Sequence, residues 1–304
     1  MTNSKKLLVL SVVFLTMALP VLAQETELEQ VQDEITAQDL EVDEQTLLPG
    51  RPFYFLKNAW RKIRETFTFN TIKKIELKEK FAGEHLIELR ELAKKGASPE
   101  LLEKATGYYS RENEQIRARI ENMEQGDASE PQLNQFLNKF SHQRILHLQI
   151  LEKLEEQVPE QVREKISEQR EEHLEHFTNV MLKLEDKENI PERLEAAIDK
   201  VRGNDFQEFK NIETLQEISE KMPEGVKEQL EDISSIRIQH FQEKLEQLSE
   251  QAQEQLQNYI EELPGNKERQ LELLRNVNQG IENLQLRQRL ESTHQRMLQE
   301  NARK

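Results

Sequence analysis

The strongest constraint on the fold of this chain is an internal duplication. Residues 147–184 align with residues 211–248 at a constant offset of 64 positions. Pro159-Glu160 falls on Pro223-Glu224 in this alignment. Tandem copies of so short a unit are typical of repeat proteins, in which each unit buries its apolar side against its neighbour. The duplication therefore predicts a fold built by stacking similar units.

Each copy reads as a helix, a break at Pro-Glu, a longer helix and a turn at Gly-Asn. The turn falls at Gly203-Asn204 in the first copy and at Gly265-Asn266 in the second. A partial third copy follows, in which Leu271, Leu274 and Val277 echo Phe209, Ile212 and Leu215. We expect helical hairpin repeats throughout residues 126–304, namely 147–210, 211–272 and a partial copy at 273–304.

Composition assigns these units to helices rather than strands. Glu, Lys, Gln, Arg and Leu dominate the 304 residues, and Gly and Pro number only 9 each. The dominant residues are good helix formers. With 36% hydrophobic and 33% charged residues, the chain suits helices that have a narrow apolar stripe and a wide solvated face. We expect an all-α protein: an N-terminal helical module followed by tandem helical hairpins, as an elongated bundle or a short helical solenoid.

The second copy contains a long stretch without helix breakers, from Gly225 to Leu263. Its apolar residues recur at steps of four and three: Phe241, Leu245, Leu248, Ala252, Leu256, Tyr259 and Leu263. A continuous helix over this stretch would span about 55–60 Å and present a coiled-coil-like seam. Such a helix needs neighbours from the same chain or from another chain, which leaves a homo-oligomer through helix pairing open.

The N-terminus resembles an export signal. Lys5 and Lys6 precede a largely apolar run from Leu7 to Leu19, and Val21-Leu22-Ala23 follows shortly after it. Val and Ala at these final positions are acceptable to signal peptidase. We expect residues 1–23 to be a signal peptide cleaved after Ala23, and the protein to be exported to the periplasm or cell envelope. The alternative is an uncleaved N-terminal anchor, although the run is short for a spanning helix.

Two segments of opposite charge follow the export signal. Residues 24–50 contain nine acidic residues and no basic ones, which predicts a disordered acidic leader over residues 24–47. Residues 51–80 contain nine basic and three acidic residues, and aromatic residues concentrate there as well. We expect residues 48–125 to form a basic-aromatic helical module.

The first helix of this module holds the best candidate for a functional surface. Five apolar residues recur at spacings of three and four, which predicts one face of a helix: Phe53, Leu56, Trp60, Ile63 and Phe67. The residues that we predict to bind a partner or a membrane are Phe53, Tyr54, Lys57, Trp60, Arg61, Lys62 and Arg64.

Three interpretations of this segment are open. The simplest is that its aromatic residues form the core of the first module while its cations are solvated. A second is an interfacial helix on anionic lipid, with Trp and Phe inserted and Lys and Arg at the headgroups. A third is the docking of a protein partner, or of the acidic leader itself, on the cationic face.

The same segment also carries a family resemblance. The run Leu48-Pro49-Gly50-Arg51-Pro52-Phe53-Tyr54-Phe55-Leu56-Lys57 and the later Arg64-Glu65-Thr66-Phe67-Thr68-Phe69 resemble a bacterial extracytoplasmic domain family of unknown function, numbered 5667. Members open with a similar Pro-Gly-Ser-Pro-Phe-Tyr run, and Arg51 stands here where Ser is commoner. The resemblance covers roughly residues 48–123. It implies an exported helical module and transfers no functional residues.

His173 and His176 are the only candidates for a metal site, and they are weak ones. They lie at i, i+3 next to carboxylates, an arrangement that can bind a divalent cation. A di-iron bundle needs Glu-x-x-His on two helices, and this chain has it once, at Glu291 and His294. His176 occupies a position that the repeat fills with His again, which favours packing. We expect no cofactor.

No catalytic motif accompanies these histidines. The chain lacks Gly-x-Ser-x-Gly, a phosphate-binding Gly loop and His-Glu-x-x-His, so we predict that it is not an enzyme. Its net charge of −16 makes nucleic acid a poor partner, and the absence of cysteine excludes disulfides and thiolate chemistry. We expect a non-catalytic exported protein that binds unidentified proteins or scaffolds the cell envelope. The alternatives are a chaperone-like or stress-sensing periplasmic binder, and a peripheral binder of anionic membranes through residues 51–80.

Overall fold

The computed structural model describes residues 35–44, 47–124 and 126–302. All regular elements in these ranges are α-helices, which confirms the all-α class. They are α1 (Tyr54–Thr66), α2 (Thr71–Lys94), α3 (Pro99–Glu121), α4 (Glu130–Gln157), α5 (Glu160–Leu184), α6 (Ile190–Ile198), α7 (Gln207–Glu220), α8 (Glu224–Glu246), α9 (Glu250–Glu262), α10 (Lys267–Gln279) and α11 (Leu284–Asn301). Within the described ranges, none of them is both long enough and apolar enough to cross a bilayer.

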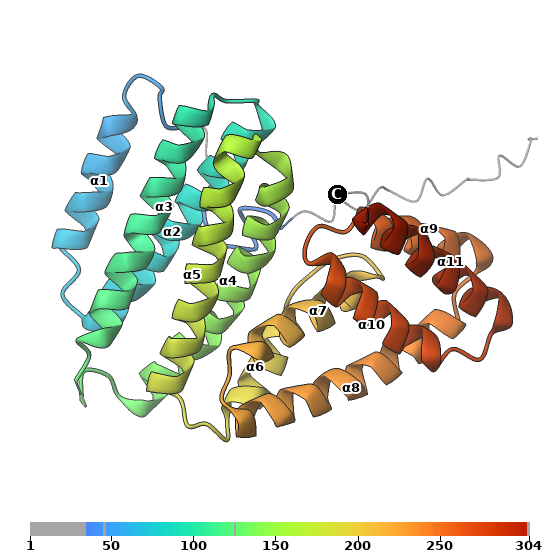
Figure 1. The fold of residues 1–304 in the computed structure, drawn as a ribbon. Coiled ribbons are helices and arrows are strands. Elements are labelled where there is room, and N and C mark those ends of the chain that lie inside the picture. The colour runs from blue at the N-terminus through green and yellow to red at the C-terminus, as the bar shows by residue number, and fades with distance from the viewer. Residues whose placement is uncertain (1–34, 45–46, 125, 303–304) are drawn as a thin grey trace, which may run out of the picture. The chain divides into compact units, whose positions relative to one another are not determined.

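Helices α2 to α5 form a four-helix bundle. In it, α2 packs against α3 and α4, and α5 packs against the same two helices (Figure 1). Local capping sets where these helices begin. The Asn70 side chain accepts a hydrogen bond from the Lys73 backbone N–H at 3.0 Å, and Ser129 forms a capping box with Gln132. Both arrangements satisfy backbone donors that have no partner inside the first helical turn.

Two apolar cores lie within the described residues. The first runs from Ala37 to Leu230 and includes the interior of the α2–α5 bundle. The second runs from Phe206 to Met297, on residues of α7 to α11 and their connections. The first core crosses residue 125, where we expected the basic-aromatic module to end and the repeat region to begin. The two regions share this core because α2 and α3 pack against α4 and α5.

Duplicated residues occupy equivalent positions in the fold. Pro159 and Pro223 are the N-cap residues of α5 and α8. The backbone N–H groups at a helix start have no carbonyl acceptor within the helix, so the N–H that proline lacks is not missed there. Phe177 and Phe241 are both fully buried further along the same two helices. The third copy begins at α10, which the Asn266 side chain caps by accepting hydrogen bonds from two backbone N–H groups. The repeat therefore corresponds to α4–α5–α6, α7–α8–α9 and α10–α11.

The stretch from Gly225 to Leu263, which a continuous helix could have spanned, is divided into two helices. Helix α8 ends at Glu246 and α9 begins at Glu250. Between them, the Ser249 hydroxyl accepts a hydrogen bond from the Ala252 backbone N–H at 3.3 Å. A Ser N-cap followed by an acidic first turn starts a new helix without Pro or Gly. The predicted seam survives in part, because Leu245 and Leu256 on either side of the break are both buried.

The acidic leader is ordered over the part that the structure describes, so the prediction of disorder is wrong there. Ala37, Leu40 and Val42 are buried in the first core. Gly83 on α2 packs closely against this segment, because a Cβ at that position would lie 3.3 Å from Val42 Cγ1, which is a tight contact. The rest of the leader, and the predicted signal peptide at residues 1–23, lie outside the described residues.

Candidate functional site

The apolar face of α1 points away from the protein. Trp60 is 61% exposed, and the aromatic residues after the helix are more exposed still, with Phe67 at 72% and Phe69 at 83%. The other members of this outward aromatic face, all exposed, are Phe53, Phe55, Leu56 and Ile63. The interpretation of these residues as the core of the first module is therefore wrong. Helical spacing identifies an apolar face but not the direction in which that face points.

The polar side of α1 holds the helix against α2. Arg61 is 6% exposed, and its guanidinium donates to Glu84 Oε2 at 2.7 Å and to Glu88 Oε1 at 2.9 Å. The Tyr54 hydroxyl donates to Glu88 Oε2 at 2.6 Å. Charge-assisted hydrogen bonds of this kind are roughly twice as strong as neutral ones. They fix which side of α1 faces inward.

Glu88 is the centre of this ionic underside. Lys57 Nζ lies 2.6 Å from its Oε1, and His85 Nδ1 lies 2.8 Å from its Oε2. Burial alone would raise the pKa of Glu88. The hydrogen bond from His85 and the charges around the carboxylate, including those of Arg61 and Lys57, instead lower that pKa to about 2. The group therefore contributes stability at neutral pH, and this contribution is lost only as the pH falls from about 4.5 towards 2.

A second ionic contact holds the C-terminal end of α1. Glu65 Oε2 lies 2.6 Å from Lys78 Nζ of α2, and its Oε1 accepts a hydrogen bond from Arg119 of α3 at 2.6 Å. Burial opposes ionisation of Glu65, but these two cations lower its pKa overall. Charged side chains on the inner side of the helix thus attach it to α2 and α3, while its apolar side remains largely exposed.

The predicted binding residues fall into three groups. Tyr54, Lys57 and Arg61 belong to the ionic underside and are not available to a partner. Phe53, Trp60 and Lys62 are exposed. Arg64 is half-buried, with its guanidinium 5.7 Å from the centre of the Phe81 ring. The acidic partners Glu84 and Glu88 were not predicted.

Phe53 adopts a backbone conformation that is rare for a bulky residue. Its φ is +70°, in the left-handed region, and it immediately precedes α1. Such a conformation costs of order 1–3 kcal/mol and persists where the surrounding structure imposes it. Its aromatic ring is 65% exposed, just before the first residue of α1. The outward aromatic face therefore extends past the helix at both ends.

A second polar cluster lies inside the α2–α5 bundle. The Tyr109 hydroxyl of α3 lies 2.7 Å from His173 Nδ1 of α5 and 3.3 Å from His147 Nδ1 of α4. The other ring nitrogen of His173 lies 3.0 Å from the Arg144 backbone carbonyl. A tautomer with hydrogen on Nε2 lets His173 donate to that carbonyl and accept from Tyr109. The buried imidazoles are thus neutral members of a hydrogen-bond network.

Arg144 of α4 provides the charge in this cluster. It is 1% exposed and forms an ion pair with Glu79 of α2. It also donates to Asn113 Oδ1 at 2.5 Å and stacks over the Phe140 ring at 4.8 Å. A buried charge needs this many partners, because leaving water costs it several kcal/mol. The cluster joins four helices and has the character of a structural network.

The arrangement does not support a metal site at His173 and His176. Both ring nitrogens of His173 are engaged, one by Tyr109 and one by the Arg144 carbonyl. His176 is half-buried and lines a shallow cavity between α3 and α5. Across the described residues, no group of three or more His, Asp and Glu side chains is placed to hold a metal ion.

The two buried histidines predict acid sensitivity. Burial, reinforced by the charge of Arg144, lowers the pKa of both His147 and His173 well below the usual value. Because histidines in the unfolded chain titrate near pH 6.5, the unfolded state binds the extra protons below that pH. Their contribution to stability is therefore present above about pH 6.5 and lost as the pH falls. Each one should lower the free energy of unfolding by up to about 1.4 kcal/mol per pH unit there.

Urea unfolding between pH 7 and pH 5 measures this effect. We expect His147→Gln to flatten the pH dependence relative to the unmodified chain, and His240→Gln, at an exposed position of α8, to leave it unchanged. Parallel profiles for the chain and both variants would show that His147 is not held neutral in the folded protein.

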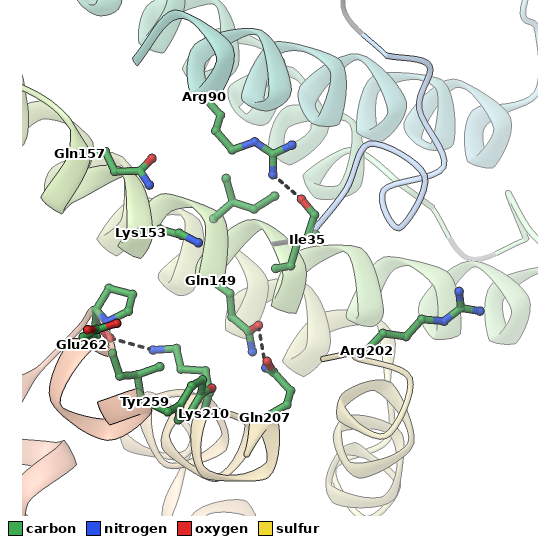
Figure 2. A pocket seen from close by; sticks show the side chains of 13 residues that line it. Ile35, Arg90, Gln149, Lys153, Gln157, Arg202, Gln207, Lys210, Tyr259 and Glu262 are labelled. Carbon is green, nitrogen blue, oxygen red and sulfur yellow. Dashed lines mark hydrogen bonds between the residues drawn. The ribbon is translucent and has the colours of Figure 1, made fainter. Parts of the chain in front are cut away.

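A cavity of about 330 Å³ lies between α4, α7 and the end of α9 (Figure 2). Some of the polar groups that line it bind one another or a neighbouring residue. Gln207 Nε2 donates to Gln149 Oε1 at 3.4 Å, and Lys210 Nζ lies 2.9 Å from Glu213 Oε2. Arg90 donates to the backbone carbonyl of Ile35, as Figure 2 shows. The cavity is thus a weaker candidate for a functional site than the outward aromatic face of α1.

Comparison of the chain with protein-family models, with curated proteins and with solved structures finds no match. The functional assignment therefore rests on the chemistry of α1 and of the helices that carry it.

Proposed function

We propose that this chain is a non-catalytic exported protein that attaches to another component of the cell envelope through the outward aromatic face of α1. The helical repeats form the body that is held there, where they bind or scaffold other proteins. The observation that carries the proposal is the orientation of α1. Its ionic underside keeps the apolar side exposed even though the chain has two apolar cores in which such residues are normally buried.

Exposed apolar side chains are concentrated on and around α1, which points to a binding partner for this face. Seven of the ten large apolar side chains that are exposed in the described residues fall between Phe53 and Phe69. Soluble monomers rarely expose contiguous apolar patches larger than a few hundred Å², and larger patches usually mark interaction sites. Burying one such side chain gains about 1.5–3 kcal/mol. A component that covers several of them is therefore held by a substantial free energy.

The chaperone-like alternative receives less support. A binder of unfolded clients needs apolar side chains spread over a concave surface, and here they gather on one helix and its two ends. In the described ranges, the other large apolar side chains that are exposed are Ile236 on α8 and Leu284 and Leu298 on α11, which are well separated along the chain. The attachment function accounts for the clustering of exposed apolar side chains on α1. It also accounts for their scarcity on the surface of the other described helices.

Photo-crosslinking in cells tests the proposal. A photoreactive residue at position 60 should crosslink to a component of the envelope, and Phe67→Asp should abolish the product. The matched control is the same residue at Ile236 on α8, which is 52% exposed but isolated. Equal yields at positions 60 and 236, or a product at 60 that survives Phe67→Asp, would contradict attachment through α1.

A further inference from the structure

We infer that the component bound by α1 is the surface of an anionic lipid bilayer, with the helix lying parallel to that surface and its outward aromatic face inserted. This inference rests on the attachment function proposed above. It names the occupant, and it explains three features of α1 together: the shape of the apolar face, the placement of its cations and the position of its one acidic residue.

The apolar face is shaped for a flat partner. Helix α1 has 13 residues, about 20 Å of helix, and exposed aromatic rings continue beyond it at both ends. Phe53 precedes the helix, while Phe67 and Phe69 follow it. A helix that binds in a protein groove uses a narrow stripe of anchors along its own length. Rings beyond both ends fit a continuous surface better than a groove.

The cations of α1 border the apolar face. Helical geometry places Lys62 on one edge of that face and the half-buried Arg64 on the other. Lys57 lies beside Arg64 but is paired with Glu88 of the ionic underside. Lys62 is exposed and forms no ion pair with any described residue. Interfacial helices show this arrangement, with Trp and Phe in the acyl boundary and cations at the headgroups.

The only acidic residue of α1 is turned inward. Glu65 is occupied by Lys78 and Arg119, so the outward face and its edges offer positive charge alone. If two copies of the chain paired through this face, the cations of one α1 would lie against the cations of the other. Their repulsion disfavours such a dimer. The complementary partner is negatively charged, and an anionic headgroup layer supplies that charge along both edges at once.

The charge of the whole chain favours the same orientation. Its net charge is −16, so an anionic surface repels the body while it attracts the cations around α1. The molecule would therefore approach such a surface with α1 foremost. No rearrangement is needed for insertion, because the apolar face is already outward and the ionic underside stays in place.

The single tryptophan of the chain, Trp60, reports insertion directly. The full chain is mixed with vesicles of phosphatidylglycerol and phosphatidylcholine in equal parts, and separately with vesicles of phosphatidylcholine alone. We expect Trp60 emission to shift to the blue and to become protected from acrylamide with the anionic vesicles, and to change far less with the neutral ones. Because the probe is local, binding through residues 1–23 would not by itself produce the signal.

Two variants with matched controls separate the contributions. Lys62→Gln/Arg64→Gln should weaken insertion by about thirtyfold, whereas Lys165→Gln/Lys187→Gln, with the same charge change on α5 and after it, should not. Ile63→Asp should abolish the shift, and Leu284→Asp on α11 should preserve it. Far-UV circular dichroism establishes that each variant is folded, and high salt should weaken binding by the unmodified chain.

The outcomes also separate this inference from the attachment function. Unchanged Trp60 emission with anionic vesicles would overturn the lipid inference. If position 60 still crosslinked to an envelope protein in cells, the attachment function would stand with a protein as the occupant. A blue shift that grows with protein concentration in the absence of lipid would instead identify a second copy and would also overturn the lipid inference.

Discussion

Replacing Arg144 with methionine is expected to lower the free energy of unfolding by about 3–5 kcal/mol, because it leaves the buried Glu79 carboxylate without its partner. Burial already raises the pKa of Glu79, and without the opposing charge of Arg144 the carboxyl should take up a proton more readily. The loss should therefore be larger at pH 8 than at pH 5. Urea unfolding of the variant at both pH values measures it.

Two control variants test whether the ion pair itself causes the loss of stability. Removing both charges together, in Glu79→Leu/Arg144→Met, should recover most of the lost stability, because no unpaired ion then remains in the core. Arg117→Met, at an exposed position of α3, should change stability by less than about 0.5 kcal/mol. A double variant as unstable as Arg144→Met alone would show that the packing of the arginine, and not the ion pair, carries the effect.

The second large effect is expected at Arg61. The Arg61→Met variant removes the partner of Glu84 and one of the cations at Glu88, which is fully buried. Breaking a buried ion pair typically costs about 3–5 kcal/mol. Here that cost should appear locally, as release of α1 from α2, because the contact between the two helices is mainly ionic. Hydrogen exchange in residues 54–66 should become much faster, while α4 and α5 remain protected.

Lys62→Met, on the exposed edge of the same helix, is the matched control and should leave exchange unchanged. If exchange in α1 stayed slow in Arg61→Met, the ion pairs of Arg61 would not be what holds the helix against α2, which contradicts the role given to Arg61 here.

The helical class was predictable because its signals are local. Pro159 and Pro223 mark helix starts through the missing N–H of proline, and Gly265 and Asn266 mark a turn and a cap in consecutive positions. These effects depend on a few neighbouring residues, so they can be read without knowledge of the fold. The break at Ser249 is local as well, but a Ser cap is a weaker signal than Pro or Gly, and the apolar seam on both sides concealed it.

The direction of α1 was not predictable from its own residues. A helix with one apolar and one polar side can bury either, and the outcome depends on what faces it. The deciding residues lie on α2, where Glu84 and Glu88 are spaced by four, as Lys57 and Arg61 are on α1. This matched spacing of opposite charges on successive helices is the signal that could have revealed the ionic underside.

The buried cluster escaped prediction for a related reason. His147 and His173 lie on different helices, and Tyr109 of α3 brings them into one network. Considering each histidine with its neighbours on the same helix tests only for metal ligands and cannot reveal contacts across a bundle. The same limit applies to the leader, where Leu40 and Val42 are buried in contacts with distant parts of the chain, Gly83 of α2 among them.

Trp60 emission in the folded chain without lipid or partner is the most direct test of the outward orientation of α1. We predict emission close to that of tryptophan in water, strong quenching by acrylamide, and little change when urea unfolds the helices. Blue-shifted emission that is shielded from acrylamide and moves to the red on unfolding, at a protein concentration where the chain is monomeric, would contradict it, because Trp60 would then lie in a core.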